Sequence, residues 1–486
     1  MMNIDNDLVS IQEARTLATD AHNAQSLWAK VTQQEVDRVC AAMAEAAFQA
    51  SERLGRMASE ETGYGWPEHK KIKNEFASRY LWQSIQDIKT VGVIRRDNER
   101  RVVEIAWPMG VVAALVPSTN PTSTVFAKVL SAVKARDGIV IAPHPAAAKC
   151  TLEAARLMAQ AAVQAGAPQG LIGCFENISL QGTQELMQHK FVSLILATGG
   201  TPMVKAAHSV GKPAYGVGPG NVPVYVDRSA DLQKAARYIV ASKAFDCSTI
   251  CSSEQSVVAD KPIAAELARL FIEQGAYFAD EKQTDLLRKL LFNPDGSMNT
   301  ATVGKPPQFL AALAGFDIPR DARIIVVRLT CTGRDEPLSR EKLTTVLGWY
   351  EEDGWEAGCE RSIELIHFGG RGHTQIIYAT DENIIMQFGL EKPVFRILVN
   401  TMGTLGAVGF TTGLMPSMTL GAGGEGGSIT GDNITVHHLY NVKRLAYELN
   451  LPPAAAMQTP GSVSGPSARE VEAIVRQVIS SILSQK

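Results

Sequence analysis

Two of the chain's seven cysteines, Cys247 and Cys251, lie four residues apart in the segment AFDCSTICSSEQ. A metal site or a disulfide would use both thiols, whereas nucleophilic catalysis requires a single thiolate. No Cys/His pair at the spacing of a zinc site accompanies them, so we predict no metal site. A buried core thiol is the ordinary state of a cysteine among apolar residues, so the rest of the sequence has to decide between core and catalysis.

An asparagine could complete a site built on one cysteine. When a thiolate attacks a carbonyl group, the oxyanion that forms needs a hydrogen-bond donor. Asn120, in PSTNPTST, follows a predicted strand in a turn bounded by prolines, where its carboxamide could donate to that oxygen. Asparagine is also a common turn residue, so Asn120 alone is a weak indication of a site.

Length and composition limit the class of protein. The 486 residues suffice for two or three domains with buried cores, and 47 Lys and Arg against 50 Asp and Glu give no basic excess for nucleic-acid binding. The N-terminal residues lack a signal-peptide pattern, and no apolar run approaches the length of a membrane span. The odd number of scattered cysteines argues against a disulfide framework. We therefore expect a soluble, cytoplasmic protein that binds neither nucleic acid nor membrane.

Hydrophobic periodicity predicts an α/β fold. Residues 7–90 have the apolar spacing of helices, and residues 92–108 contain two β-branched runs separated by RRDNERR, which indicates a hairpin. From about 110 to 240, apolar runs alternate with helical patterns, and this alternation predicts a doubly wound, mostly parallel sheet. Its strand candidates are GVVAALVP, DGIVIAPH, LIGCFEN, FVSLILATGG and VPVYVD. A second α/β stretch, 241–430, has the candidates RIIVVRLT, IELIHFG, TQIIYAT and RILVNT.

The C-terminal part changes character. Residues 420–433 are glycine-rich, as in a flexible loop or in a loop that approaches a ligand. Residues 451–466 have the Pro/Gly/Ser/Ala composition of a flexible linker. Residues 467–486 begin with a capping box, Ser467 with Glu470, and predict an amphipathic helix. Its apolar face should dock on a partner or on the protein's own oligomer, and its polar face is too poor in Lys and Arg for a membrane-surface helix. That face comprises Val471, Ile474, Val475, Val478, Ile479, Ile482 and Leu483.

Several motifs occur together in one order, namely VPSTNPTST, APHPAAAKCT, ATGGTPMVKAA, GVGPGNVPVYVD, AFDCSTICSSEQ and EKLTTVLGWYE. They closely resemble those of the CoA-acylating aldehyde dehydrogenases, the branch of the aldehyde dehydrogenase superfamily that includes the aldehyde half of bifunctional aldehyde–alcohol dehydrogenases. The resemblance covers about residues 10–450. It implies two doubly wound, Rossmann-like domains with a small β oligomerisation arm. These are a cofactor-binding domain at 1–240 with a hairpin arm near 92–108, a catalytic domain at 241–430 and a return segment at 431–450.

The resemblance also implies the roles of the chemical residues. It assigns the nucleophile to Cys251 and leaves Cys247 without a fixed role. Cys251 would attack an aldehyde, and Asn120 with the backbone N–H of Cys251 would hold the oxyanion. Hydride would pass to a nicotinamide, and CoA would take the acyl group from the cysteine.

The cofactor contacts follow from the same resemblance. The adenosine side of NAD would lie near Pro143, His144 and Pro145, and its pyrophosphate near Thr198, Gly199 and Gly200. The nicotinamide would lie beside Gly218, and Glu341 would contact the nicotinamide ribose. PHP replaces the ribose-binding lysine of hydrolytic members, which leaves NAD or NADP open. His373, in a family GHT motif, would shape the active site or the CoA path, or be a structural histidine.

One departure distinguishes the acylating branch from the hydrolytic one. Hydrolytic members carry a water-activating glutamate before the cysteine, whereas the matching segment YGVGPGNVP has no carboxylate. Its absence favours a thiol acceptor over water. A CoA-independent hydrolytic aldehyde dehydrogenase and a catalytically silent assembly scaffold remain the alternatives.

Acetaldehyde is the first choice of substrate and propionaldehyde the second. Sulfoacetaldehyde would need a basic anchor, and Glu425 in the glycine-rich loop would repel it if that side chain faces the substrate. The linker and amphipathic helix resemble the peptides that deliver enzymes into bacterial microcompartments. The resemblance thus implies a cytoplasmic homodimer or homotetramer inside such a compartment, attached to shell or other cargo through residues 467–486.

Overall fold

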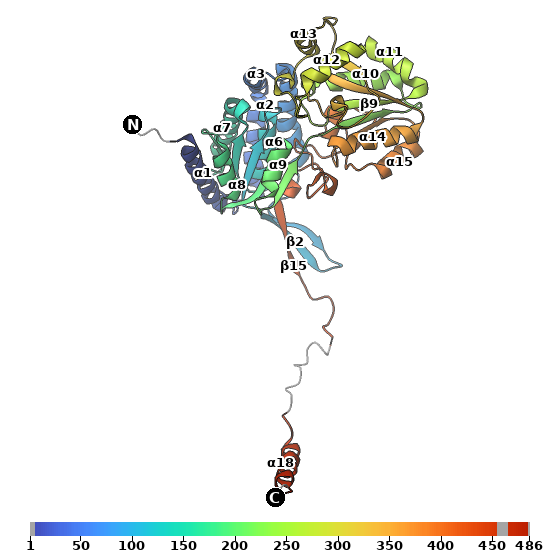
Figure 1. Ribbon diagram of the computed structural model, residues 1–486. Helices are drawn as coiled ribbons and strands as arrows, with labels where there is room; N and C mark the ends of the chain where they lie inside the picture. The colour runs from blue at the N-terminus through green and yellow to red at the C-terminus, as the bar shows by residue number, and fades with distance from the viewer. Residues whose placement is uncertain (1–4, 454–464, 485–486) are drawn as a thin grey trace. The chain divides into compact units, whose positions relative to one another are not determined.

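The computed structural model describes residues 5–453 and 465–484 (Figure 1). The chain divides into a large compact unit, Met1–Gly92 with Ala106–Val442, and a small one, Val93–Ile105 with Lys443–Lys486. The predicted linker at 451–466 lies mostly outside the described residues. Among the helices that the structure describes, none combines the length and the hydropathy of a membrane span.

The N-terminal third of the large unit begins with helices, as the apolar spacing predicted. Thr32 and Glu35 form a capping box that fixes the start of the second helix. A π-helical turn, Phe76–Tyr80, joins the last two helices of the set. The helices are α1 (Asn6–Trp28), α2 (Gln33–Gln49), α3 (Ser51–Thr62), α4 (Pro67–Glu75) and α5 (Leu81–Ile85).

The first sheet has five parallel strands in the order β5-β4-β3-β6-β7. Every residue of β3 and β4 is buried, as expected for central strands of a sheet covered on both faces. The strands are β3 (Val111–Val116), β4 (Gly138–Pro143), β5 (Ile172–Cys174), β6 (Val192–Thr198) and β7 (Ala214–Val217). The helices between them are α6 (Pro121–Lys134), α7 (Ala148–Gln164), α8 (Leu180–Gln188) and α9 (Thr201–His208).

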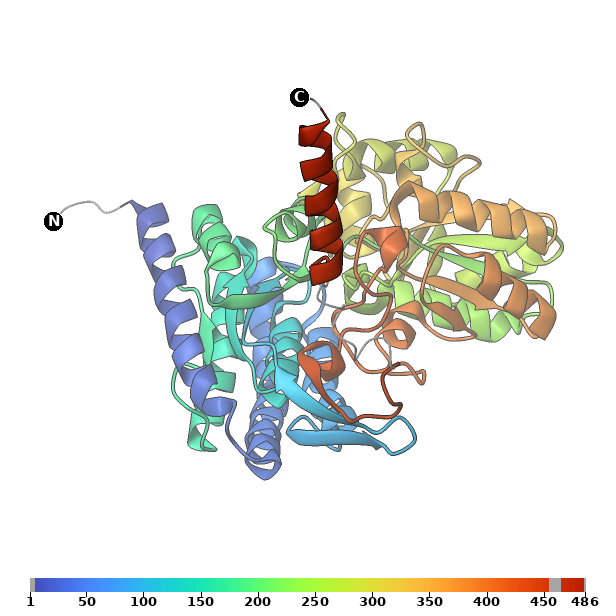
Figure 2. The same cartoon turned by 90° about the horizontal axis from the view of Figure 1, so that it is seen from below.

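The second sheet has seven parallel strands in the order β10-β11-β12-β9-β8-β13-β14. They are β8 (Val222–Val226), β9 (Glu254–Asp260), β10 (Ala276–Phe278), β11 (Ile324–Arg328), β12 (Val346–Glu352), β13 (Gln375–Tyr378) and β14 (Ile397–Val399). The helices are α10 (Leu232–Ala244), α11 (Ala264–Glu273), α12 (Glu281–Leu291), α13 (Pro307–Ala314), α14 (Trp355–Gly369), α15 (Glu382–Glu391) and α16 (Gly403–Ala407). Figure 2 shows α1, in blue, and the helices of the second sheet, in green to orange, on opposite sides of the large unit. Two parallel sheets with helices between their strands confirm the α/β prediction.

Most predicted strands form, but one is wrong. IELIHFG lies inside helix α14. Its apolar run suggested a buried strand, yet the buried positions Gly358, Cys359, Ser362, Leu365 and Ile366 follow a helical spacing that the short window concealed. VPVYVD forms β8 and pairs with β9 and β13, so it belongs to the second sheet.

The predicted hairpin is confirmed. It is part of a three-stranded sheet ordered β1-β2-β15, with β1 (Gly92–Asp97), β2 (Val102–Pro108) and β15 (Tyr440–Ala446). In the small unit, Arg444 forms an ion pair with Glu104 at 3.1 Å. The C-terminal helix, α18 (Ala468–Leu483), begins with the predicted capping box of Ser467 and Glu470. Every apolar side chain of its predicted face is exposed.

Candidate active site

The segment that carries the two cysteines joins α10 to β9. Asp246, Cys247 and Ser248 have φ values of 47°, 50° and 65°, a left-handed run that is rare for residues other than glycine. Such a run persists only where surrounding contacts hold it. The buried carboxylate of Asp246 supplies them, because it accepts hydrogen bonds from the Trp66 backbone N–H (2.9 Å) and the Thr249 hydroxyl (2.7 Å).

Access distinguishes the two thiols. Cys251 is partly exposed and lines a cavity of about 790 Å³, whereas Cys247 is 1% exposed and is not part of that lining. Burial raises the pKa of each thiol to about 12, helped by the charge of Glu341 for Cys251 and of Asp246 for Cys247. Arg396 and the backbone N–H groups of Cys251 and Ser252 act in the opposite direction on the pKa of Cys251. Only Cys251 is placed to meet a substrate.

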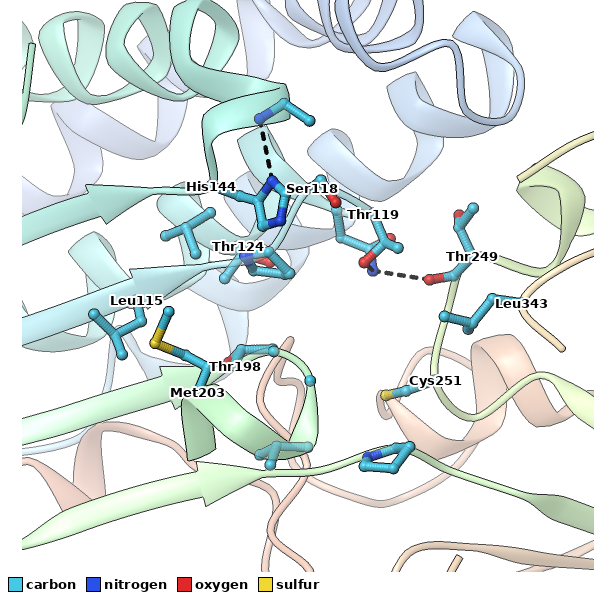
Figure 3. Close-up of a pocket in the computed structure, with 18 of the residues that line it drawn as sticks. Leu115, Ser118, Thr119, Thr124, His144, Thr198, Met203, Thr249, Cys251 and Leu343 are labelled. Carbon is cyan, nitrogen blue, oxygen red and sulfur yellow. Dashed lines mark hydrogen bonds between the residues drawn. The ribbon is translucent and has the colours of Figure 1, made fainter. Parts of the chain in front are cut away.

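One cavity gathers nearly all the predicted site residues. The Cys251 sulfur points into it, toward the side on which Thr198 and Met203 lie (Figure 3). The predicted residues that line it come from the ends of strands in both sheets and from the connecting loops, and they are Asn120, Pro143, His144, Pro145, Thr198, Gly199, Gly200, Gly218, Cys251 and Glu341. His373 is the one predicted site residue outside it.

Asn120 lies at the N-cap of α6, beside the cysteine segment. Its Nδ2 group donates to the Thr249 carbonyl at 3.1 Å (the dashed line that ends at Thr249 in Figure 3) and to the Thr119 hydroxyl at 3.1 Å. Its Oδ1 accepts a hydrogen bond from Lys73. The Asn120 side-chain amide is thus bonded to Thr249, two residues before Cys251 in the sequence. To bind an oxyanion, one of its N–H groups would exchange its present acceptor for the oxyanion.

The residues predicted for the adenosine side and the pyrophosphate of the cofactor follow the ends of β4 and β6, the strands on either side of β3. Pro143 ends β4, and His144 and Pro145 begin the next turn. Thr198 ends β6, and Gly199 and Gly200 connect it to α9. Ligands of doubly wound sheets bind at this carboxyl edge, and the N-terminus of the next helix attracts phosphate. The buried Thr198 hydroxyl has no hydrogen-bond partner among the described residues, which leaves it available to a bound group.

Glu341 lies in the segment before β12. Its Oε1 accepts from the Gly220 backbone N–H at 2.9 Å. Burial raises the pKa of Glu341 to about 7, against the effects of that hydrogen bond and of Lys243 and Lys342. A Cβ atom at Gly218 would meet nothing within 4 Å, so the cavity wall is open at that position.

Two further residues singled out in the sequence do not line the cavity. His373 is 1% exposed, and its Nδ1 shares a hydrogen bond with the Thr374 hydroxyl at 2.9 Å. Burial and Arg396 lower the pKa of His373 to about 3, so the ring is neutral at physiological pH. Glu425 lies in the exposed turn Gly424–Gly426, with Arg371 4.0 Å away. Glu425 therefore does not face the cavity.

The sequence pattern did not reveal the charged residues that lie behind the site. Lys70, Lys73 and Asp246 are buried, and each lysine forms an ion pair with Asp246. The lysines occur in HKKIKN, a pattern typical of a solvated helix face, and their burial depends on contacts with the distant cysteine segment. The only available signal was the FD dipeptide before the cysteines, which marked Asp246 as part of a motif.

Comparisons with known proteins agree with this geometry. Residues 8–281 match the sequence profile described as the aldehyde dehydrogenase family. The chain belongs to the aldehyde dehydrogenase family. It is 39% identical to the bifunctional aldehyde-alcohol dehydrogenase AdhE of Escherichia coli K12, with 90% of this chain and 50% of that protein covered. It is 37% identical to the acetylating succinate-semialdehyde dehydrogenase of Clostridium kluyveri, over 90% of this chain and 96% of that one. The chain thus spans about half the length of the bifunctional relatives that it matches.

Solved structures of aldehyde dehydrogenases share the fold. An acetylating aldehyde dehydrogenase from Geobacillus thermoglucosidasius is 49% identical, with a TM-score of 0.91 over 92% of this chain and 99% of that one. A propionaldehyde dehydrogenase from the fucose utilisation microcompartment of Clostridium phytofermentans is 27% identical, with a TM-score of 0.82 and coverage of 90% and 97%. The Rhodopseudomonas palustris propionaldehyde dehydrogenase with bound CoA and an acylated cysteine is 26% identical, with a TM-score of 0.80 and coverage of 89% and 97%. These structures confirm the aldehyde dehydrogenase-like fold.

The raised pKa of Cys251 predicts how its alkylation depends on pH. In a Cys247→Ala background, the rate at which iodoacetamide modifies Cys251 should rise about tenfold per pH unit between about pH 7 and pH 9, because only the thiolate reacts. Glu341→Gln removes a charge that raises this pKa and should speed alkylation about three- to tenfold at pH 8. Peptide mass spectrometry measures both rates. A plateau below pH 9, or slower alkylation of the Glu341 variant, would contradict this prediction.

Proposed function

We propose that this chain is a CoA-acylating aldehyde dehydrogenase that oxidises a short aldehyde with NAD and CoA to acyl-CoA and NADH. The observation that carries the proposal is that Cys251 opens onto the same cavity as Asn120 and the two strand-end segments suited to a dinucleotide. A scaffold without activity has no need of this arrangement. The acylating relatives and the acylated-cysteine neighbour support the same chemistry.

The cavity residues fit a dinucleotide. About 790 Å³ is within the usual range for a ligand site, and the unpaired Thr198 hydroxyl and the open wall at Gly218 provide a polar contact and a close approach. Thr198, Gly199 and Gly200 would hold the pyrophosphate, and Glu341 the nicotinamide ribose. When bound, NAD accepts the hydride.

The protein's own residues perform the remaining steps. The Cys251 thiolate attacks the aldehyde carbon, and the new C–S bond pushes the carbonyl electron pair onto oxygen. The Asn120 amide and the Cys251 backbone N–H stabilise that oxyanion. Loss of hydride from the same carbon restores the carbonyl group and leaves an acyl thioester on Cys251. A second thiolate, that of CoA, displaces Cys251 in a thioester exchange.

The lining of the cavity favours CoA over water as the acceptor. Among the described residues that line it, Glu341 is the one carboxylate, and the Gly220 N–H binds its Oε1. The segment YGVGPGNVP, which joins β7 to β8, has no carboxylate that could activate water. Without that general base, hydrolysis should be slow and the thioester should persist until CoA arrives.

The lining also favours a short, uncharged aldehyde. No Lys or Arg lines the cavity within the part of the chain that the structure describes, so a carboxylate or sulfonate on the substrate would have no cationic partner there. Apolar side chains dominate the lining instead, among them Ile250, Leu343, Val408, Met418 and Leu420. Acetaldehyde is our first choice and propionaldehyde the second. Among the described residues that line the cavity around Pro143–Pro145 there is also no Lys or Arg, which favours NAD over NADP, because the extra phosphate of NADP needs a cationic partner.

A panel of kcat/KM values tests substrate and cofactor together. With CoA present, acetaldehyde and propionaldehyde should exceed succinate semialdehyde and sulfoacetaldehyde by about 100-fold or more, since burying an unpaired charge costs several kcal/mol. NAD should exceed NADP with the best aldehyde. Equal rates for the charged aldehydes would show that a cationic group reaches the substrate.

Replacing each cysteine in turn tests the nucleophile. Cys251→Ala should lower kcat for acyl-CoA formation about 10⁴-fold or more, as for other lost nucleophiles. Cys247→Ala is the matched control, because its sulfur is buried off the cavity, and it should retain most of the activity. Acyl-CoA and NADH are measured together. Loss of activity in the Cys247 variant alone would reverse the assignment.

We propose in addition that residues 467–486 attach the enzyme to the shell or cargo of a bacterial microcompartment. Helix α18 exposes an apolar face that a monomer leaves unburied, and one of the solved neighbours belongs to a microcompartment. The sheet of β1, β2 and β15 would serve as the oligomerisation arm of a homodimer or homotetramer. The domain boundaries predicted from the resemblance, 1–240 and 241–430, are part of the same proposal.

Deleting residues 452–486 separates attachment from catalysis. The truncated enzyme should keep its kcat and its oligomeric state, because the described part of the deleted segment contributes no residue to the cavity. It should lose co-sedimentation with isolated shells. Light scattering and turnover measure the first two properties, and a change in either would mean that the helix packs within the enzyme's own oligomer.

A further inference from the structure

Three charged side chains are buried directly behind the nucleophile segment. Asp246 is fully buried, and Lys70 and Lys73 are 2% and 3% exposed. Lys70 and Lys73 lie three residues apart on one face of α4, and each donates from Nζ to Asp246 Oδ2, Lys70 at 3.1 Å. The cluster connects the N-terminal helices to the cysteine segment between α10 and β9.

The cluster holds one more cation than neutrality requires. Burying a charge costs several kcal/mol unless a partner compensates it, and one lysine would suffice for one carboxylate. The second ammonium group is costly, because burial lowers the pKa of Lys73, an effect that the pairing with Asp246 partly offsets in favour of the ammonium form. Packing alone therefore does not account for Lys73.

The two lysines differ in their other partners. Lys70 donates to the Thr119 backbone carbonyl at 3.2 Å, whereas Lys73 donates to the Asn120 side-chain oxygen, Oδ1. An ammonium group can only donate, so Asn120 has to turn its oxygen toward Lys73 and its Nδ2 group toward Thr249 and the cavity. A cation at the oxygen also draws electron density from the amide and makes its N–H groups stronger donors.

We propose that Lys73 is a positioning residue for the reaction at Cys251, which fixes the orientation of the Asn120 amide and strengthens its hydrogen bond to the oxyanion. Lys73 shares its other partner, Asp246, with Lys70. The cysteine segment therefore keeps an ion pair with α4 when Lys73 is replaced, whereas the Asn120 oxygen loses its cation. This inference rests on the proposed function, since it concerns the oxyanion formed at Cys251.

The test is a double-mutant cycle between Lys73 and Asn120. Lys73→Met leaves a neutral Lys70–Asp246 pair, so the variant should fold. It should lower kcat for acyl-CoA formation about 10- to 100-fold with little change in KM for the aldehyde, whereas Asn120→Ala should lower kcat about 100- to 1,000-fold. In the Asn120→Ala background, Lys73→Met should have almost no further effect, because its target is gone. Additive losses would overturn the proposal.

Two controls distinguish positioning from a general structural effect. Lys70→Met removes the other lysine that pairs with Asp246 and leaves the hydrogen bond between Lys73 and Asn120 in place. This variant enzyme should retain most of the wild-type kcat. Alkylation of Cys251 by iodoacetamide involves no oxyanion, so Lys73→Met should leave its rate unchanged. If alkylation slows as much as turnover, Lys73 acts on the cysteine segment alone and the proposal fails. The proposed function is tested separately, by whether the wild-type enzyme produces acyl-CoA. The role of Lys73 is tested only by the ratios of kcat between the variants.

Discussion

The contacts of the buried Asp246 carboxylate constrain the whole site. Asp246 begins a three-residue left-handed run of the backbone, which turns the chain so that Cys251 reaches the cavity. Such a run needs strong local contacts. Besides Thr249, the partners of the Asp246 carboxylate lie on α4 and at Trp66 just before it, far away in sequence. Packing there is close, since a Cβ atom at Gly65 would lie 1.9 Å from Asp246 Oδ1. The active-site segment is thus held by the N-terminal helices as well as by the sheet that follows it.

The two sheets contribute different functions to one cavity. The carboxyl ends of β4 and β6 carry the segments suited to a dinucleotide, and the approach to β9 carries the thiol. Gly220, in the connection between β7 and β8, lies close to the backbone of Cys251, because a Cβ atom there would lie 2.2 Å from the Cys251 carbonyl oxygen. Its N–H also binds Glu341. The same short connection therefore contacts both the nucleophile segment and Glu341, the residue predicted for the nicotinamide ribose.

Local pattern was enough to predict much of this arrangement, and the failures have physical causes. Buried parallel strands such as β3 and β4 are continuous apolar runs, which can be recognised in the sequence. The capping box of Ser467 and Glu470 involves residues only three positions apart, so a short segment is enough to predict it. IELIHFG was wrong because a buried helix and a buried strand look alike over seven residues. The predicted residues that line the cavity lie in motifs, whereas Lys73 was missed because its burial arises from contacts across 173 positions of sequence. His373 has its motif but lies outside the cavity, which spacing cannot reveal.

The central claim is that Cys251 carries the acyl group and delivers it to a thiol. The most direct measurement is the mass of the peptide containing residues 244–255 after the enzyme is incubated with acetaldehyde and NAD, without CoA, and quenched in acid. The account predicts one acetyl group on Cys251, which persists in water and disappears on addition of CoA as an equal amount of acetyl-CoA forms. An unmodified peptide, an acetyl group on Cys247, or release as free acetate at the same rate with and without CoA would contradict it.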